Sequence, residues 1–212
     1  MHILAIDEAG KGCVIGPLVV CGVLISEEKV DELKKLGVKD SKLLTKEQRD
    51  IFFDKIEKLV VDYKIIKIPP SEIDDKTLNL NRLEAKKIVE IINSFEADVV
   101  VIDCPHPNTK TYENELTSSL EYNPKMVVEH KADLNHPEVA AASILAKVTR
   151  DNVIEKIKSK IGIDFGSGYP SDPKTKEFVD KYYDKYPEIF RKTWQTYKNV
   201  KKKKEQKKLG EF

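Results

Sequence analysis

The chain opens on a short apolar segment that ends in two adjacent carboxylates. Residues 2–6, His-Ile-Leu-Ala-Ile, lead directly into Asp7 and Glu8, and a Gly-Lys-Gly loop follows at 10–12. An acidic pair at the mouth of a buried strand is costly to desolvate unless it is paired or binds a cation. We therefore expect a core strand whose end carries either a divalent-cation site beside a phosphate-binding loop or, in the plainer interpretation, a solvated hairpin turn.

Two further strands end in an aspartate. The run 99–102, Val-Val-Val-Ile, is β-branched throughout, which is typical of a central strand buried on both faces, and Asp103 follows it. Asp133 lies just beyond a shorter apolar segment at 126–128. Three such strand ends would bring together the hard oxygen ligands that a pair of divalent ions requires, namely Asp7, Glu8, Asp103 and Asp133.

The pattern of the remaining residues predicts alternating strands and helices. A second strand within 18–25 is close enough in sequence to the first to pair antiparallel, and a further strand is expected over 62–68. We expect helices over about 26–36, 45–58, 81–93, 109–121 and 137–160. Ser26 and Thr45 are the predicted N-caps of the first two, Thr45 in a capping box with Gln48.

The long helix carries polar side chains on one face. Ser143, Lys147 and Arg150 recur at i, i+4 and i+7. A hydroxyl, an ammonium and a guanidinium beside a carboxylate cluster could neutralise it or bind phosphates. The alternative is an ordinary amphipathic helix whose charges are solvated, and the spacing alone does not decide between them.

Composition limits the class of protein. A chain of 212 residues with 34% charged and 40% apolar residues can form one sizeable core. The apolar stretch 14–25 is interrupted by glycine and proline and is too short to span a bilayer, and the start resembles no secretory signal. The three cysteines show no zinc spacing, so we expect reduced thiols and a cytoplasmic location. We also expect a monomer with no membrane partner.

Charge is unevenly distributed. The segment 191–208 holds nine basic residues and one acidic residue, although the whole chain has a net charge of only +1. Such a segment would attract a nucleic-acid backbone, and a solubilising tail is the plainer alternative. Phe190, Trp194 and Tyr197 recur at i, i+4 and i+7, so we expect a helix here that docks on the core through one aromatic face.

These motifs together resemble the family of type 2 ribonuclease H. The blocks that carry the resemblance, in that family's order, are Asp7-Glu8-Ala9-Gly10-Lys11-Gly12, Asp40-Ser41-Lys42, Val101-Ile102-Asp103, Lys131-Ala132-Asp133 and residues 136–151. The resemblance implies a ribonuclease H-like α/β fold, a mixed central sheet flanked by helices. It also implies an endonuclease that hydrolyses the RNA of RNA–DNA hybrids and cuts on the 5′ side of ribonucleotides embedded in duplex DNA.

The resemblance assigns roles to particular residues. Catalysis and metal binding are expected at Asp7, Glu8, Asp103 and Asp133, with two Mg²⁺ or Mn²⁺ ions bridged by Asp7 and products that carry 5′-phosphate and 3′-hydroxyl ends. Substrate binding is expected at Gly10, Lys11, Gly12, Lys42, Ser143, Lys147 and Tyr169. Of these, the glycine loop and Tyr169 would recognise the ribose 2′-hydroxyl, the group that distinguishes RNA from DNA.

Two alternatives remain to be weighed. Type 3 ribonuclease H shares the fold and the Gly-Lys-Gly loop but carries a substantial domain ahead of its first carboxylates, where this chain has six residues, so we set it aside. A catalytically silent nucleic-acid-binding module is the second alternative. The intact set of four carboxylates argues against it, because unneutralised anions would repel DNA.

The extreme C-terminus resembles a clamp-binding peptide. Gln206, Leu209 and Phe212 have the spacing of the peptide by which replication and repair proteins bind a ring-shaped sliding clamp, and a frayed tail is the plainer alternative. We therefore expect a catalytic domain over 1–185, a basic helical extension over 186–205 and a clamp-binding tail over 206–212.

Overall fold

The computed structural model describes the backbone of residues 1–38 and 44–209, and the side chains of those residues as far as Gln206. The strands are β1 (His2–Ala9), β2 (Leu18–Ser26), β3 (Asp62–Ile68), β4 (Val99–Asp103) and β5 (Lys125–Glu129). The helices are η1 (Glu27–Lys29), α1 (Val30–Leu36), α2 (Lys46–Leu59), α3 (Pro70–Ile73), α4 (Leu80–Ile92), α5 (Thr109–Thr117), α6 (Ala132–Asn135), α7 (Pro137–Ile161), α8 (Pro173–Tyr182) and α9 (Gln195–Leu209). Within this described part of the chain, no helix has both the length and the hydropathy needed to cross a membrane.

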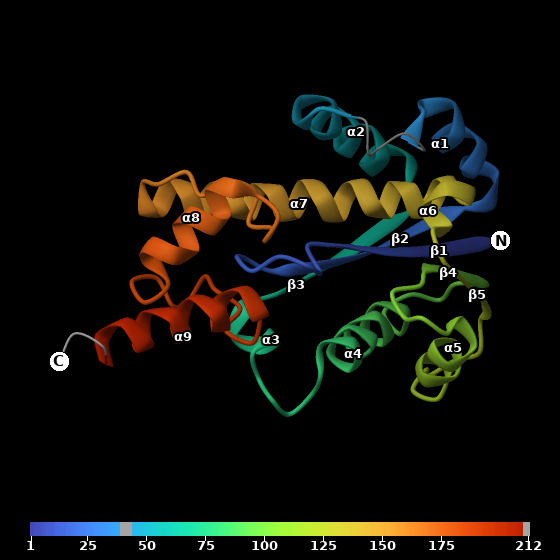
Figure 1. Ribbon diagram of the computed structural model, residues 1–212. Helices are drawn as coiled ribbons and strands as arrows, with labels where there is room; N and C mark the ends of the chain where they lie inside the picture. Colours follow the sequence, from blue (N-terminus) through green and yellow to red (C-terminus); the bar gives the residue numbers. More distant parts are fainter. Residues whose placement is uncertain (39–43, 210–212) are drawn as a thin grey trace. The chain divides into compact units, whose positions relative to one another are not determined.

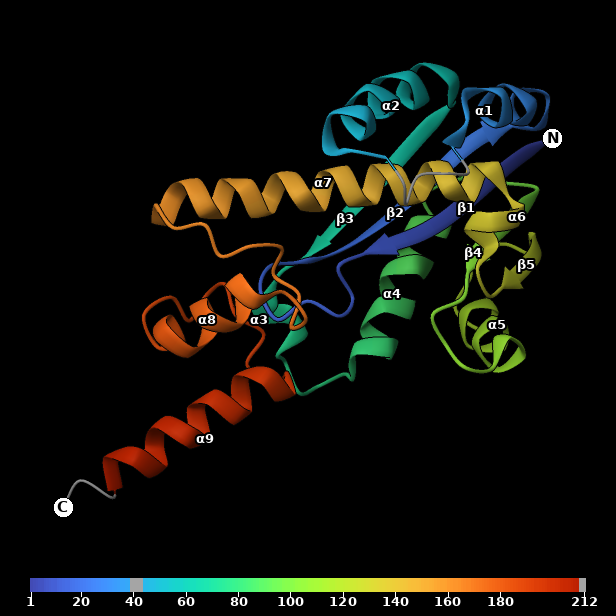
Figure 2. The same ribbon diagram turned by 45° about the horizontal axis from the view of Figure 1, so that its top comes forward.

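The strands form one mixed sheet in the order β3-β2-β1-β4-β5 (Figures 1 and 2). β1 pairs antiparallel with β2, whereas β1 with β4 and β4 with β5 are parallel. Parallel pairs need a long crossover connection, and the chain between β2 and β4 supplies one that includes α4. The mixed sheet that the sequence predicted is confirmed.

Strand alternation divides the sheet residues between two helical layers. Val19, Cys21, Val23 and Ile25 of β2 are fully buried in a cluster with the first half of α7 and with α1 and α2. An alanine run, Ala140 to Ala142, lies in that cluster and allows α7 to approach the sheet closely. On the other face α4 comes so near that a Cβ added at Gly22 would lie 2.3 Å from the Ile91 side chain. Figure 1 shows α7 on one side of the sheet and α4 and α5 on the other.

The chain forms two compact units, neither of which is continuous in sequence. The first comprises Met1–Ala9, Val19–Ile66 and Leu78–Thr149, and the second Gly10–Leu18, Lys67–Thr77 and Arg150–Phe212. The second unit has its own core, in which the Phe178 ring lies 5.2 Å from that of Phe165 and 5.9 Å from that of Phe190, measured between centroids. The boundary predicted near residue 185 concerns functional regions and stays a prediction.

Local capping confirms one sequence expectation and corrects another. Thr45 forms the predicted capping box, because its hydroxyl accepts from the Gln48 amide at 3.3 Å and its own amide donates to Oε1 of Gln48 at 2.8 Å. The prediction that Ser26 caps a helix was wrong. Ser26 ends β2, its side chain makes no capping hydrogen bond, and a 3₁₀ turn precedes α1. Gly37 does end α1, at φ 84°.

Two other helices differ from their predicted extent. α5 ends at Thr117 rather than at residue 121. The aromatic residues at 190, 194 and 197 do not share one helical face, because α9 begins only at Gln195. Phe190 is nevertheless fully buried and Tyr197 is buried beside it, so the segment docks on the second core as expected. The aromatic packing was therefore predicted correctly and its helical geometry wrongly.

Candidate active site

The parallel pairing of β1 and β4 places two aspartates at neighbouring strand ends. The last pair of the ladder joins Ile6 to Ile102, and each strand continues with an aspartate, Asp7 and Asp103. Parallel strands end at the same edge of a sheet, so the two carboxylates emerge side by side. Asp7 lies within β1 and Asp103 is the last residue of β4, and the residues that precede them, Ile6 and Ile102, are fully buried.

Asp133 reaches the same edge through a short helix. The amide of Ala132 donates to Oδ1 of Asp103 at 3.2 Å, which fixes the first turn of α6 against the end of β4. Lys131 precedes it at φ 57°, a left-handed conformation that non-glycine residues rarely adopt, and this turn redirects the chain after β5. Asp133 is consequently held with only 5% of its surface exposed.

The pKa of Asp7 responds to the charges of the other two carboxylates. Burial, together with the negative charges of Asp103 and Asp133, raises the pKa of Asp7 to about 7, although a hydrogen bond from Ser143 partly offsets this rise. Ser143 is therefore on the carboxylate side of α7, and its expected contact with substrate stays a prediction. Without a counter-charge, Asp7 is therefore only partly ionised near neutral pH.

Glu8 occupies the opposite face of the sheet. Adjacent residues of a strand point to opposite faces, so Asp7 is directed toward α7 and Glu8 toward the layer of α4 and α5. There its charge, after burial and the charge of Glu84, contributes to raising the pKa of Tyr112. The structure thus brings three of the four predicted carboxylates together, and the metal-binding role of Glu8 stays a prediction.

The donor set at the sheet edge fits a divalent cation. Carboxylate oxygens are the ligands that Mg²⁺ and Mn²⁺ prefer, and mutual repulsion among buried carboxylates is relieved when a cation binds between them. Within residues 1–38 and 44–206, no three His, Cys, Asp or Glu side chains already stand in a metal-binding arrangement. The carboxylates are therefore within electrostatic reach of one another but do not form a finished coordination shell.

The Gly-Lys-Gly loop belongs to the second compact unit. Gly10 has φ 85°, and a Cβ there would lie 2.9 Å from the carbonyl oxygen of Pro17, so the position requires glycine. A Cβ at Gly12 would lie 3.9 Å from Cε1 of Tyr169, which shows that the tyrosine ring borders the loop. The structure thus brings together two elements, the loop and Tyr169, that the resemblance assigned to ribose recognition.

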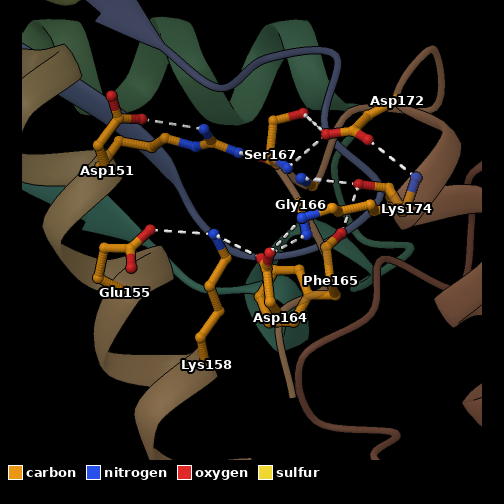
Figure 3. Close-up of polar contacts among 12 residues, drawn as sticks. Asp151, Glu155, Lys158, Asp164, Phe165, Gly166, Ser167, Asp172 and Lys174 are labelled. Carbon is orange, nitrogen blue, oxygen red and sulfur yellow. Dashed lines mark hydrogen bonds and ion pairs between the residues drawn. The ribbon is translucent and has the colours of Figure 1, made fainter. Parts of the chain in front are cut away.

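The segment that carries Tyr169 is held by a network of polar contacts (Figure 3). Asp172 accepts from the amide and the hydroxyl of Ser167, each at 2.7 Å, and also caps α8 through the amide of Lys174. Asp164 binds Lys174 at 2.6 Å and Lys158 at 3.1 Å. Burial raises the pKa of Tyr169 to about 12, so its hydroxyl keeps its proton.

Several predicted residues receive less support. Lys42 lies outside the described residues, as does Phe212, and the side chain of Leu209 is not described. Lys147 is half-buried on α7, four residues beyond Ser143, and its contact with phosphate stays a prediction. Gln206 is exposed on α9, which continues as far as Leu209.

Sequence analysis missed one residue that contacts the Gly-Lys-Gly loop. Arg191 is fully buried and donates to the carbonyl oxygens of Gly10, Lys11 and Gly16. In the sequence it is the first residue of a basic segment, which suggests solvation or nucleic-acid binding. The available sequence signal was its position between Phe190 and Trp194, two aromatic residues that were expected to dock on the core.

Similarity to solved structures defines the class of protein. The ribonuclease H2 of Pyrococcus horikoshii OT3 superimposes with a TM-score of 0.90 at 42% identity, covering 96% of this chain and 98% of that one. The ribonuclease HII of Archaeoglobus fulgidus, solved in complex with PCNA, gives a TM-score of 0.85 at 40% identity over 92% of this chain and 96% of that one. Together with the sheet order and its carboxylate-bearing edge, this is the ribonuclease H-like fold of a nuclease.

Sequence comparison then gives the family. The family model described as ribonuclease HII matches residues 4–197. The ribonuclease HII of Pyrococcus abyssi is 45% identical over 208 residues, which cover 96% of this chain and 92% of that protein. The chain belongs to the ribonuclease HII family, and it is an endonuclease that cleaves RNA in RNA–DNA hybrids and at embedded ribonucleotides. This excludes the non-catalytic alternative and agrees with setting type 3 aside.

Proposed function

We propose that Asp7, Asp103 and Asp133, together with Glu8, hold two divalent ions, Mg²⁺ or Mn²⁺, and that this chain cuts the phosphodiester bond on the 5′ side of a ribonucleotide. The observation that carries the proposal is the buried Asp7, whose pKa is raised to about 7 by burial and by the charges of Asp103 and Asp133. A carboxylate cluster of this kind is stable in its ionised form when cations neutralise it.

The chain's own residues prepare the site for those ions. When bound, the ions neutralise the charge that develops on the attacking and leaving oxygens, and the products carry 5′-phosphate and 3′-hydroxyl ends. Ser143 orients Asp7 by its hydrogen bond, which favours the ionised carboxylate that a cation would bind. Lys147, one turn further along α7, supplies a positive charge for a substrate phosphate.

Selectivity for ribose is assigned to the second unit. The Gly-Lys-Gly loop leaves β1 directly after Ala9, so the chain itself joins the carboxylate strand to the element that contacts the sugar. Tyr169 borders that loop, as the contact at Gly12 shows. We assign to these two elements the recognition of the 2′-hydroxyl, with the tyrosine ring stacking on the sugar.

A divalent-ion titration of cleavage tests the proposal. Parent protein, Asp103→Asn and Asp98→Asn are compared on a duplex DNA with one embedded ribonucleotide. Asp98 is the matched control, because it also lies on the chain of β4 but before the strand, where its side chain accepts from the amide of His2 at 2.7 Å. Added divalent ion should restore cleavage by the parent protein and by Asp98→Asn. Asp103→Asn should remain inactive. Near-normal cleavage by Asp103→Asn would contradict the metal assignment.

We also propose that the C-terminal tail binds a sliding clamp through Gln206, Leu209 and Phe212. The support is the spacing of these residues and the existence of a PCNA complex of the Archaeoglobus fulgidus relative, which is 40% identical. α9 brings Gln206 to an exposed position near the chain end. A short helical segment with two apolar anchors can enter an apolar groove.

A cytoplasmic location and a monomeric state remain proposals. The three cysteines, all in the described part of the chain, are buried and not in disulfides, which is compatible with a reducing compartment. Size-exclusion chromatography with light scattering would test the monomeric state.

A further inference from the structure

Two buried arginines of the second unit surround the residues assigned to ribose recognition. Arg191 is fully buried and Arg150 is 3% exposed. A guanidinium keeps its charge at neutral pH, and burying that charge is costly unless hydrogen bonds compensate it. Two such side chains in one small unit therefore require a physical reason beyond packing.

Arg191 binds three carbonyl groups of a single loop. Its Nη2 donates to the oxygen of Gly10 at 2.7 Å, its Nη1 to that of Lys11 at 2.8 Å, and its Nε to that of Gly16 at 2.9 Å. The guanidinium also lies 4.9 Å from the centre of the Trp194 ring. The planar fork of donors thus fixes both ends of the loop at once, which a single ammonium cannot do.

These bonds determine which way the loop presents its amides. In a trans peptide the carbonyl and the following N–H point in opposite directions, and no cis bond occurs in the described residues. Because the Gly10 and Lys11 carbonyls point toward Arg191, the N–H groups of Lys11 and Gly12 are turned away from it. The buried arginine accordingly sets the outward face of the Gly-Lys-Gly loop.

Arg150 connects the same loop to Tyr169. Its Nη2 donates to Sγ of Cys13 at 3.0 Å and also to the carbonyl oxygen of Ser167, and the guanidinium lies 5.0 Å from the centre of the Tyr169 ring. Its Nη1 pairs with Asp151 at 3.1 Å. A Cβ at Gly168 would lie 3.0 Å from Nη2, so that glycine allows the close approach. Arg150 thus fixes Tyr169 relative to the loop.

We propose that Arg150 and Arg191 are positioning residues that hold the Gly-Lys-Gly loop and Tyr169 in the arrangement that recognises a ribose 2′-hydroxyl. The inference rests on the function proposed for these two elements. Both guanidiniums are buried, so they act through the loop and the tyrosine rather than by contact with substrate. Recognition of one hydroxyl depends on placement to within about an ångström, and a displacement of that size can reduce the rate by about 100-fold.

The test uses Arg191→Lys and Arg150→Lys, which keep the charge and remove the fork of donors. Steady-state cleavage is measured on a duplex with one ribonucleotide, and an all-DNA duplex of the same sequence is used as competitive inhibitor. We expect kcat/KM to fall by about 10- to 100-fold in each variant. The inhibition constant of the all-DNA duplex should stay unchanged, because attraction to the backbone depends on charge and the charge is retained.

Val179→Ala is the control for lost stability. Val179 is fully buried in the core of the same unit, on α8, and lies outside the hydrogen bonds of both arginines. At a temperature well below the melting point of every variant, Val179→Ala should keep the parent kcat/KM. If Val179→Ala loses as much kcat/KM as the lysine variants, the arginines act only as core residues that stabilise the unit. That result would overturn the proposal.

Three other results would also overturn it. Unchanged kcat/KM in both lysine variants would show that the arginines do not position the loop and Tyr169. A rise in the inhibition constant of the all-DNA duplex as large as the fall in kcat/KM would show that the arginines contribute only general attraction to the nucleic-acid backbone. If the lysine variants do not fold, Trp194→Leu, which removes the ring beside Arg191, must lower kcat/KM several-fold. Failure of the metal proposal appears separately, as activity of Asp103→Asn.

Discussion

At the scale of single residues, Asp7 is a buried carboxyl group with a strongly raised pKa. It is 6% exposed and its pKa is raised from 3.8 to about 7 by burial and by Asp103 and Asp133. In the unfolded chain the same carboxyl ionises near its ordinary pKa, so the folded metal-free protein binds a proton that the unfolded chain has lost. Stability of the metal-free protein should therefore fall as pH rises from about 4 to about 7.

Asp7→Asn should remove this pH dependence. In EDTA the variant should be more stable than the parent, by a margin that grows between pH 4 and pH 7 and levels off above it, with an upper bound of about 4 kcal/mol. Added Mg²⁺ should stabilise the parent more than the variant, and the variant should not cleave. Thermal unfolding with and without Mg²⁺ measures the two stability effects, and a cleavage assay measures the third. A parent curve that is flat with pH would contradict the electrostatic explanation.

Tyr169 allows stacking to be separated from hydrogen bonding. Its ring borders Gly12 and Arg150, and its hydroxyl is hydrogen-bonded to Cys13. Tyr169→Ala should lose most cleavage of a duplex with one embedded ribonucleotide, by about 10-fold or more, whereas Tyr169→Phe should lose less if the ring is the contact with the sugar. Initial rates at subsaturating substrate measure both variants. Full activity of the alanine variant would remove Tyr169 from the site.

At the scale of secondary-structure elements, the predicted caps differ in what they contribute. Thr45 forms a complete capping box at the start of α2, whereas the side chain of Ser26 makes no capping hydrogen bond. The two residues therefore give a matched pair of substitutions to alanine in the same unit.

Thr45→Ala should destabilise the protein by about 1 kcal/mol, the usual contribution of an N-cap, and Ser26→Ala should change stability by less than about 0.5 kcal/mol. Urea unfolding at pH 7 measures the difference between them. Equal effects of the two substitutions would show that the capping box at α2 adds nothing to the stability of the whole unit.

At the scale of the whole molecule, the chain end is expected to serve a partner rather than the chemistry. Deletion of residues 206–212 should leave cleavage of short substrates unchanged and eliminate binding to the clamp of the host. Calorimetry with the purified clamp measures the binding. The deletion also removes two lysines, so full-length protein with Lys207→Gln and Lys208→Gln is the control and should keep most of its clamp affinity. Equal binding by the truncated and full-length proteins would contradict the proposal.

The sequence by itself determined most of the strands and the family, and it singled out the carboxylates of the candidate site. The runs at 2–6 and 99–102 are apolar and β-branched enough to be recognised as buried strands, and each ends in an acidic residue that a core strand does not otherwise tolerate. Thr45 and Gln48 carry their capping pattern within four residues. Such features depend on neighbours in the chain, and a linear pattern therefore predicts them.

Only the tertiary structure decided how these residues divide between faces and partners. Strand alternation places Glu8 and Asp7 on opposite faces, but the packing of the helices decides what each meets there, Ser143 of α7 for Asp7 and the layer of α4 and α5 for Glu8. In the sequence, Arg191 is part of a basic segment. In the structure it donates hydrogen bonds to carbonyl oxygens within residues 10–16, some 180 positions earlier in the chain. A guanidinium is buried only where distant backbone oxygens converge on it, and that convergence is a property of the folded chain.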